Sequence, residues 1–66
     1  MPYEKVMVDG KQFWLFRESM TNYRLYDPAE DKDVGSGTFT VMGFQLPATD
    51  IAEAIYQQAK GKQNGL

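Results

Sequence analysis

Two reactive residue types are absent from the 66-residue sequence, which contains no cysteine and no histidine. Without cysteine, no disulfide can support the fold and no thiolate is available as a metal ligand or nucleophile. Without histidine, the chain lacks the side chain that most often serves as an acid or base near neutral pH. Lack of cysteine is also typical of intracellular proteins, so we expect a cytoplasmic location.

Long apolar runs and an excess of basic residues are missing as well. No segment approaches the ~20 apolar residues that a helix needs to cross a bilayer. The first ten residues lack the basic and then apolar order of a signal peptide. The net charge of −2 disfavours nucleic acid or an anionic membrane as a partner, because both attract strongly basic surfaces. We therefore expect a soluble domain with no membrane partner.

Turn signals divide the first two thirds of the chain into short strands. Asp9-Gly10 is typical of a two-residue hairpin, because a type I′ turn needs positive φ at both central residues. Pro28 cannot donate to a sheet and should end a strand, and the acidic stretch 27–33 predicts a turn. The Gly-Ser-Gly stretch 35–37 indicates a bend or bulge at the entrance of the last strand. The expected strands are 3–8, 11–17, 23–27 and 38–42, with 18–22 as a connection.

From Thr49 onward, apolar residues recur at helical spacing. Thr49 or Asp50 should begin the helix, and Gly61 should end it. The predicted fold is α+β: an antiparallel sheet of three or four strands with one C-terminal helix packed on one face. One domain over 1–61 and a flexible tail at 62–66 complete the layout. The apolar stripe of the helix consists of Ile51, Ala52, Ile55, Tyr56 and Ala59.

The hairpin turn also decides which side chains share a face, because successive side chains of a strand point to opposite sides. It sets Val8 opposite Lys11, and hence Lys5 opposite Trp14. One face is then almost purely apolar and should form the core against the helix. That core face is expected to carry Val6, Val8, Phe13, Leu15, Tyr23, Leu25, Phe39 and Val41.

The second face of the predicted sheet has a different character. It mixes aromatic rings with methionine, one lysine and one arginine, and it carries no carboxylate. Aromatic residues, Met and Arg are enriched where proteins bind one another. We therefore interpret this face as a docking surface for a protein partner or for a second copy. Its expected binding residues are Tyr3, Lys5, Met7, Trp14, Phe16, Arg24 and Tyr26.

Two simpler interpretations of the second face stay open at this point. Tyr and Trp suit a half-exposed pleated surface without binding anything. Trp14 could also be covered within the chain by the 18–22 connection or by Phe44 and Leu46. If the docking interpretation holds, a compact acidic chain of this kind suits an inhibitor or accessory factor, and one encoded by a phage is an option.

Little in the sequence points to catalysis, so we expect no enzyme, no cofactor and no metal. Ser19 and Ser36 have no base to activate them. The carboxylates at 27–33 are expected to be solvated, and their spacing does not match an EF-hand loop. Gly35-Ser36-Gly37-Thr38 resembles a fragment of a phosphate-binding loop, but no helix follows it directly.

A second functional hypothesis comes from a resemblance. Asp27-Pro28, the stretch Gly37-Thr38-Phe39, and the helix residues Ala52, Ala54 and Tyr56 resemble β-sheet DNA-binding domains of the AP2 type and the arm-binding domains of phage integrases. That resemblance implies a sheet whose outer side lies in the major groove, with a helix packed behind it. The cations that could contact DNA here are Lys5 and Arg24, with Lys11 and Arg17 nearby.

Overall fold

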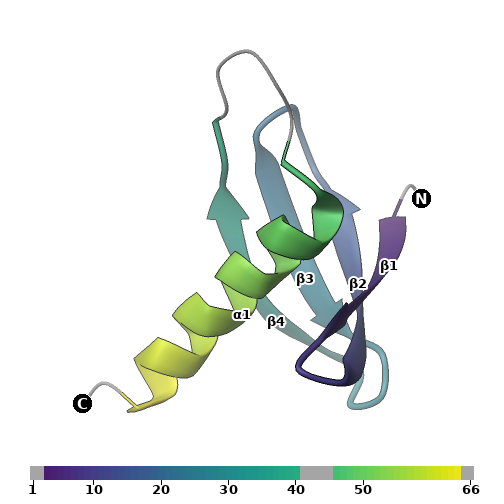
Figure 1. The fold of residues 1–66 in the computed structure, drawn as a ribbon, viewed down its shortest axis with the longest axis vertical. Helices are drawn as coiled ribbons and strands as arrows, with labels where there is room; N and C mark the ends of the chain where they lie inside the picture. Colours follow the sequence, from purple (N-terminus) through teal and green to yellow (C-terminus); the bar gives the residue numbers. More distant parts are fainter. Residues whose placement is uncertain (1–2, 41–45, 65–66) are drawn as a thin grey trace.

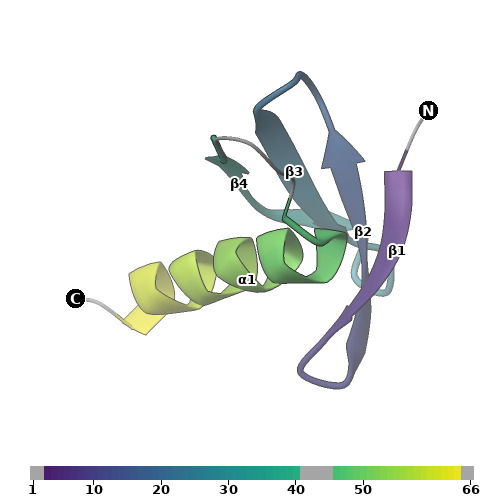
Figure 2. The same ribbon diagram turned by 45° about the horizontal axis from the view of Figure 1, so that its top comes forward.

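A computed structural model describes residues 3–40 and 46–64. Four strands form one antiparallel sheet in the order β1-β2-β3-β4, and a single helix follows them. The helix crosses one face of the sheet and contacts all four strands (Figure 1 and Figure 2). The predicted α+β fold is thereby confirmed, in its four-stranded form. The elements are β1 (Tyr3–Val8), β2 (Lys11–Arg17), β3 (Asn22–Asp27), β4 (Lys32–Thr38) and α1 (Ala48–Asn64).

The first hairpin forms as the sequence predicts. Asp9 and Gly10 both have positive φ, 56° and 78°, the conformation that a type I′ turn requires. Val8 pairs with Lys11 and Lys5 pairs with Trp14. This register decides the two faces of the sheet, since a slip of one residue would exchange them.

The core lies between α1 and the sheet. The helix contributes Ile51, Ala52 and Ile55, each at most 4 % exposed. Each buried side chain of isoleucine size stabilises the fold by roughly 1.5–3 kcal/mol, so this layer supplies most of the stability of so small a domain. From the sheet the core receives Val6, Val8, Phe13, Leu15 and Leu25, with Tyr23, Val34, Phe39, Leu46, Ala48 and Tyr56 packed around them.

The fourth strand is the main departure from the predicted layout. It spans 32–38, so the prediction of 38–42 was wrong: Phe39 and Thr40 continue without strand structure, and 41–42 lie outside the described residues. Gly35 explains the error, because glycine is depleted in strands. Here the helix passes so close that a Cβ at Gly35 would lie 3.4 Å from Ile55 Cγ2. A register shift does occur, but it falls at Val34 within β4, whereas residues 35–37, where the bend or bulge was expected, pair regularly with β3.

Other element boundaries also differ from the prediction, and β3 begins at Asn22, one residue earlier than expected. The acidic turn shrinks to residues 28–31, with Asp31 at a φ of 55°, because both its flanks pair in the sheet. The helix begins at Ala48, where the Pro47 carbonyl accepts hydrogen bonds from the N–H groups of Asp50 and Ile51. It continues past Gly61 to Asn64. Within the described residues, no helix has the length and apolar character needed to span a bilayer.

The close approach of α1 to β4 can be tested by adding a side chain at Gly35. Valine suits a strand by propensity, but a Cβ at this position would already contact Ile55 and Ala59 at 3.4 and 3.7 Å, which leaves little room for the two γ-methyl groups. We expect Gly35→Val to lower the free energy of unfolding by about 1–3 kcal/mol, the usual cost of overpacking. Urea denaturation followed by circular dichroism measures it.

Ser36→Val is the matched control, because Ser36 is exposed and belongs to the same strand. It should change stability by no more than ~0.5 kcal/mol. Equal effects of the two substitutions would contradict the proposed packing.

Candidate functional site

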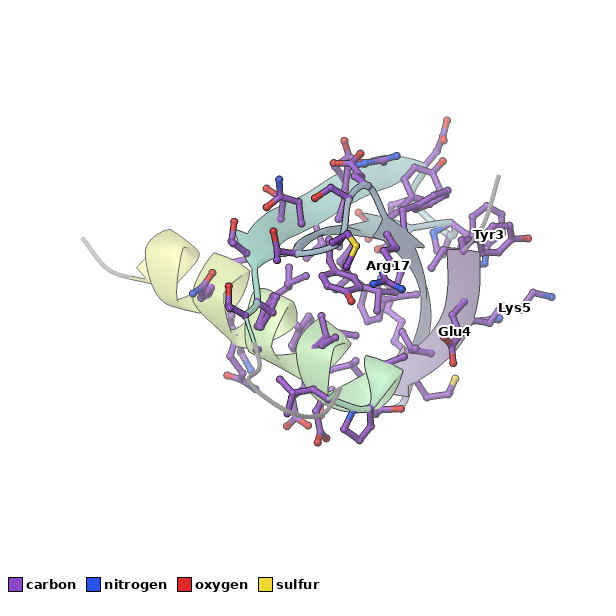
Figure 3. The ribbon with its side chains drawn as sticks, turned by 90° about the horizontal axis from the view of Figure 1, so that it is seen from above. Tyr3, Glu4, Lys5 and Arg17 are labelled. Atoms are coloured by element: carbon purple, nitrogen blue, oxygen red, sulfur yellow. The ribbon has the colours of Figure 1, made fainter. Side chains whose placement is uncertain are left out.

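The sheet surface opposite α1, which we call the outer face, contains all seven residues that the sequence assigned to a docking surface. No element within 3–40 or 46–64 covers it (Figure 2). Tyr3 and Lys5 project away from the helix, whereas Glu4 and Arg17 lie on the helix side (Figure 3). Strand alternation places the others with Tyr3 and Lys5: they are Met7, Trp14, Phe16, Arg24 and Tyr26.

Four aromatic rings form a continuous cluster on the outer face. The ring centroids of Tyr3 and Trp14 lie 4.8 Å apart, and those of Trp14 and Tyr26 lie 5.6 Å apart. Phe16 closes the cluster at 5.3 Å from Tyr3 and 6.3 Å from Tyr26. Trp14 and Phe16 are therefore half-buried by their neighbours on the same face rather than by another layer. Such pairs contribute about 0.5–1.5 kcal/mol each beyond the area they bury.

Arg24 is fixed in place beside this cluster. Its guanidinium lies over the ring of Phe16, 4.5 Å from the centroid. It donates to a carboxylate oxygen of Glu18 at 2.8 Å and to one of Asp33 at 2.7 Å. These two carboxylates raise the pKa of Arg24. Three side chains thus hold the guanidinium in one orientation, which lowers the entropy lost when it binds a partner.

The expectation of an outer face without carboxylates was wrong. Asp33 pairs with Tyr26 across β3 and β4 and therefore shares its face. Asp31 accepts a hydrogen bond from the Tyr26 hydroxyl, and Glu18 reaches the face from the turn before β3. Asp33 was not expected on this face because the last strand was predicted at 38–42, too late in the sequence. If the turn had been predicted directly after Asp27, Asp33 would have been expected to pair with Tyr26.

The cations proposed to contact DNA do not gather on one surface. Arg17 lies on the helix side, with its guanidinium 6.0 Å from the ring centroid of Tyr23. Lys11 forms ion pairs with Asp27 at 2.8 Å and with Glu30 at 3.8 Å. Arg24 is already paired with two carboxylates, so Lys5 and Arg17 are the two of these four cations that form no ion pair with a described residue.

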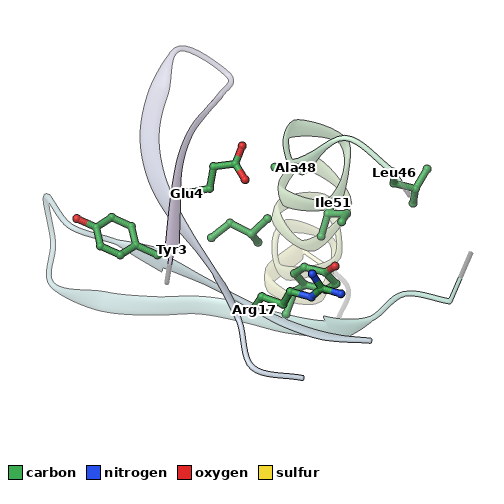
Figure 4. A pocket seen from close by; sticks show the side chains of 8 residues that line it. Tyr3, Glu4, Arg17, Leu46, Ala48 and Ile51 are labelled. Atoms are coloured by element: carbon green, nitrogen blue, oxygen red, sulfur yellow. The ribbon is translucent and has the colours of Figure 1, made fainter. Parts of the chain in front are cut away.

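A cavity of about 390 Å³ opens between the sheet and the start of α1 (Figure 4). Glu4 and Arg17 contribute polar groups to its wall, while the ring of Tyr3 points away from it. Leu46, at one side, adjoins residues 41–45, which the structure does not describe. We therefore assign the cavity no ligand. Its other lining residues are Leu15, Tyr23, Ala48 and Ile51.

The acidic turn has a structural explanation. Asp27 is only 4 % exposed, and its Oδ1 accepts hydrogen bonds from the backbone N–H groups of Ala29 and Glu30 at 3.0 and 3.3 Å. The hydrogen bond from Lys11, supported by these two, lowers the pKa of Asp27, and Asp27 in turn raises the pKa of Lys11. Asp27 therefore stabilises the turn as an anion, contrary to the expectation that it would be solvated.

Comparison of this chain with protein-family models, with curated proteins and with solved structures returned no match. The resemblance to AP2-type and integrase arm-binding domains gains no support from these comparisons.

The ion pair of Asp27 predicts a specific dependence of stability on pH. Asparagine at position 27 keeps the oxygen that accepts from Ala29 and Glu30 but removes the charge that Lys11 binds. Because the folded-state pKa of Asp27 is lowered, its contribution is present above the unfolded value of about 3.9 and is lost as pH falls through the folded value. Asp27→Asn should therefore be less stable than wild type at pH 7, and the difference should shrink below about pH 4.

Urea denaturation at a series of pH values between 7 and 2 measures this difference. Asp9→Asn is the control, because Asp9 is exposed in the first turn and has no ion pair to a described residue. A deficit of Asp27→Asn that stays constant across this range would contradict the assignment.

Proposed function

We propose that this chain is a small, non-enzymatic binding protein that docks through its outer face on the surface of another protein molecule, as an inhibitor or accessory factor would. The observation that supports this most is the aromatic cluster formed by Tyr3, Trp14, Phe16 and Tyr26, which no described element covers. Exposed contiguous apolar surface of this kind marks interaction sites in soluble proteins.

The composition of the outer face favours protein as the partner. Trp, Tyr and Arg supply most of the binding energy at protein interfaces, and all three occur here at the centre of one surface. Arg24 is held over Phe16 by two carboxylates, so it can offer its remaining N–H donors without first being ordered. Exposed Met7, at 58 %, supplies an adaptable apolar contact at the margin.

The charges on the outer face disfavour DNA. Affinity for DNA rises with the number of phosphates that free cations neutralise. Here Glu18, Asp31 and Asp33 outnumber Lys5 and Arg24 on or beside the face. A phosphate backbone laid across β3 and β4 would meet this acidic margin.

The docking proposal predicts that Trp14→Ala removes binding while the domain stays folded. Truncating a central aromatic residue of an interface costs about 2 kcal/mol or more, which lowers affinity at least ~30-fold. Affinity capture from a lysate of the source organism, followed by calorimetry with the captured protein, measures the loss. Circular dichroism checks the fold.

Two further variants make the result decisive. Gln57→Ala, on the exposed side of α1, should leave binding unchanged. Met7→Glu, an exposed change on the outer face, should weaken binding even if Trp14→Ala proves too unstable to use. Capture of the same protein by wild type, Trp14→Ala and Met7→Glu in equal yield would contradict a role for this face.

Binding to DNA can be tested separately, and the docking proposal predicts that it is absent. Fluorescence anisotropy with a labelled duplex should show no saturable binding even at low salt, because paired cations release few counterions. Binding that falls steeply as salt is added, and that Lys5→Gln and Arg24→Gln weaken, would overturn this expectation and restore DNA as the partner.

A further inference from the structure

The outer face has a charge pattern that is complementary to itself. Cross-strand pairing places four residues in one row across the sheet: Lys5 pairs with Trp14, Trp14 with Tyr26, and Tyr26 with Asp33. The row therefore begins with a cation on β1, continues through two aromatic rings, and ends with a carboxylate on β4. All four side chains lie on the outer face.

The charged residues around the two ends of the row also differ in sign. Glu18, Asp31 and Asp33 approach the β4 side, and Arg24 is the one guanidinium that opposes them there among the described residues. Three carboxylates against one guanidinium leave that side negative. Lys5, on the β1 side, forms no ion pair with a described residue.

From this row we infer that the outer face binds a second copy of this chain, face to face, about a two-fold axis parallel to the strands. The inference deepens the proposed function and rests on it, since it names the occupant of the same surface. Such an axis lays β1 of one copy over β4 of the other and β2 over β3. Lys5 of each copy then meets Asp33 of the other, and each Trp14 meets the other copy's Tyr26.

Symmetry makes this arrangement specific. An isologous interface uses every contact twice, so one complementary pair of charges produces two intermolecular ion pairs. An axis perpendicular to the strands would instead set Lys5 against Lys5 and Asp33 against Asp33, and like charges placed together disfavour that arrangement. Packed sheets also prefer nearly aligned strands, rotated by about 30°. Both axes satisfy this packing preference, so the charge row is what selects the axis parallel to the strands.

The size of the face sets the expected strength. Four strands about 4.8 Å apart and six residues long at ~3.3 Å per residue give a projected area of roughly 380 Å². Stable interfaces bury about 800 Å² of accessible surface per partner. The dimer should therefore be weak, with a dissociation constant in the range of about 10–500 µM.

Charge reversal at the two ends of the row tests the inference. Sedimentation equilibrium should show self-association of the wild-type chain over this concentration range. Lys5→Glu sets like charges together in both contacts and should weaken the dimer about tenfold or more. Asp33→Lys should do the same. An equimolar mixture of the two variants restores both ion pairs, so a heterodimer of near wild-type affinity should form.

The helix side provides controls of matched charge change. Lys60→Glu and Glu53→Lys are both exposed on α1, and neither should change self-association. Asp33→Lys also removes a carboxylate from Arg24, so circular dichroism must confirm its fold. If it fails to fold, Lys5→Glu decides alone, because Lys5 is exposed on the edge strand: dimerisation equal to wild type overturns the inference.

The remaining outcomes separate the inference from the proposed function. A wild-type chain that stays monomeric at ~500 µM overturns the homodimer, and if capture of another protein still depends on Trp14, the proposed function stands. Self-association that both charge variants retain overturns the proposed arrangement. Loss of self-association in each variant and its recovery in the mixture supports it.

Discussion

The packing of one helix against one face of the sheet is the interaction on which the rest of the structure depends. Ile51 and Ile55 meet Phe13, Leu15 and Leu25 in a layer that is almost fully buried. Residues 3–40 and 46–64 contain one helix and one sheet, and the helix covers one side of that sheet. Side chains of the strands alternate between the two faces of the sheet. Those that do not point toward α1 therefore form the outer face and point to solvent or to another molecule.

Part of the apolar surface of the outer face is buried by contacts between side chains of that same face. Rings on β1, β2 and β3 contact one another, and Arg24 lies over Phe16 while two carboxylates hold it. Such lateral packing makes the surface rigid without covering it. Rigid aromatic residues and an ordered guanidinium bind with little loss of conformational entropy. The same contacts that stabilise the monomer thus prepare the face for a partner.

Much of this could be predicted from the sequence where local chemistry decides the outcome. Asp9-Gly10 fixed the first hairpin, its register and the two faces, because positive φ at both positions leaves few alternatives. The fourth strand could not be placed in this way, since glycine is depleted in strands and the packing of Gly35 against Ile55, a residue distant in sequence, appears only in the folded chain. That one error hid Asp33, and with it both the ion pair of Arg24 and the charge row. The prediction that Gly61 ends the helix was wrong for a different reason. Glycine often follows the last residue of a helix, but it is also tolerated inside one.

The fluorescence of Trp14 tests the central claim most directly, because it is the one tryptophan in the chain. In dilute protein, with the outer face uncovered, acrylamide should quench Trp14 efficiently, to an extent typical of partly exposed indole. As protein concentration rises, quenching should fall and the emission should shift to shorter wavelength as rings from a second copy cover it. Strong protection of Trp14 from quenching in dilute, monomeric protein would contradict the account, since the indole would then already be enclosed within its own chain.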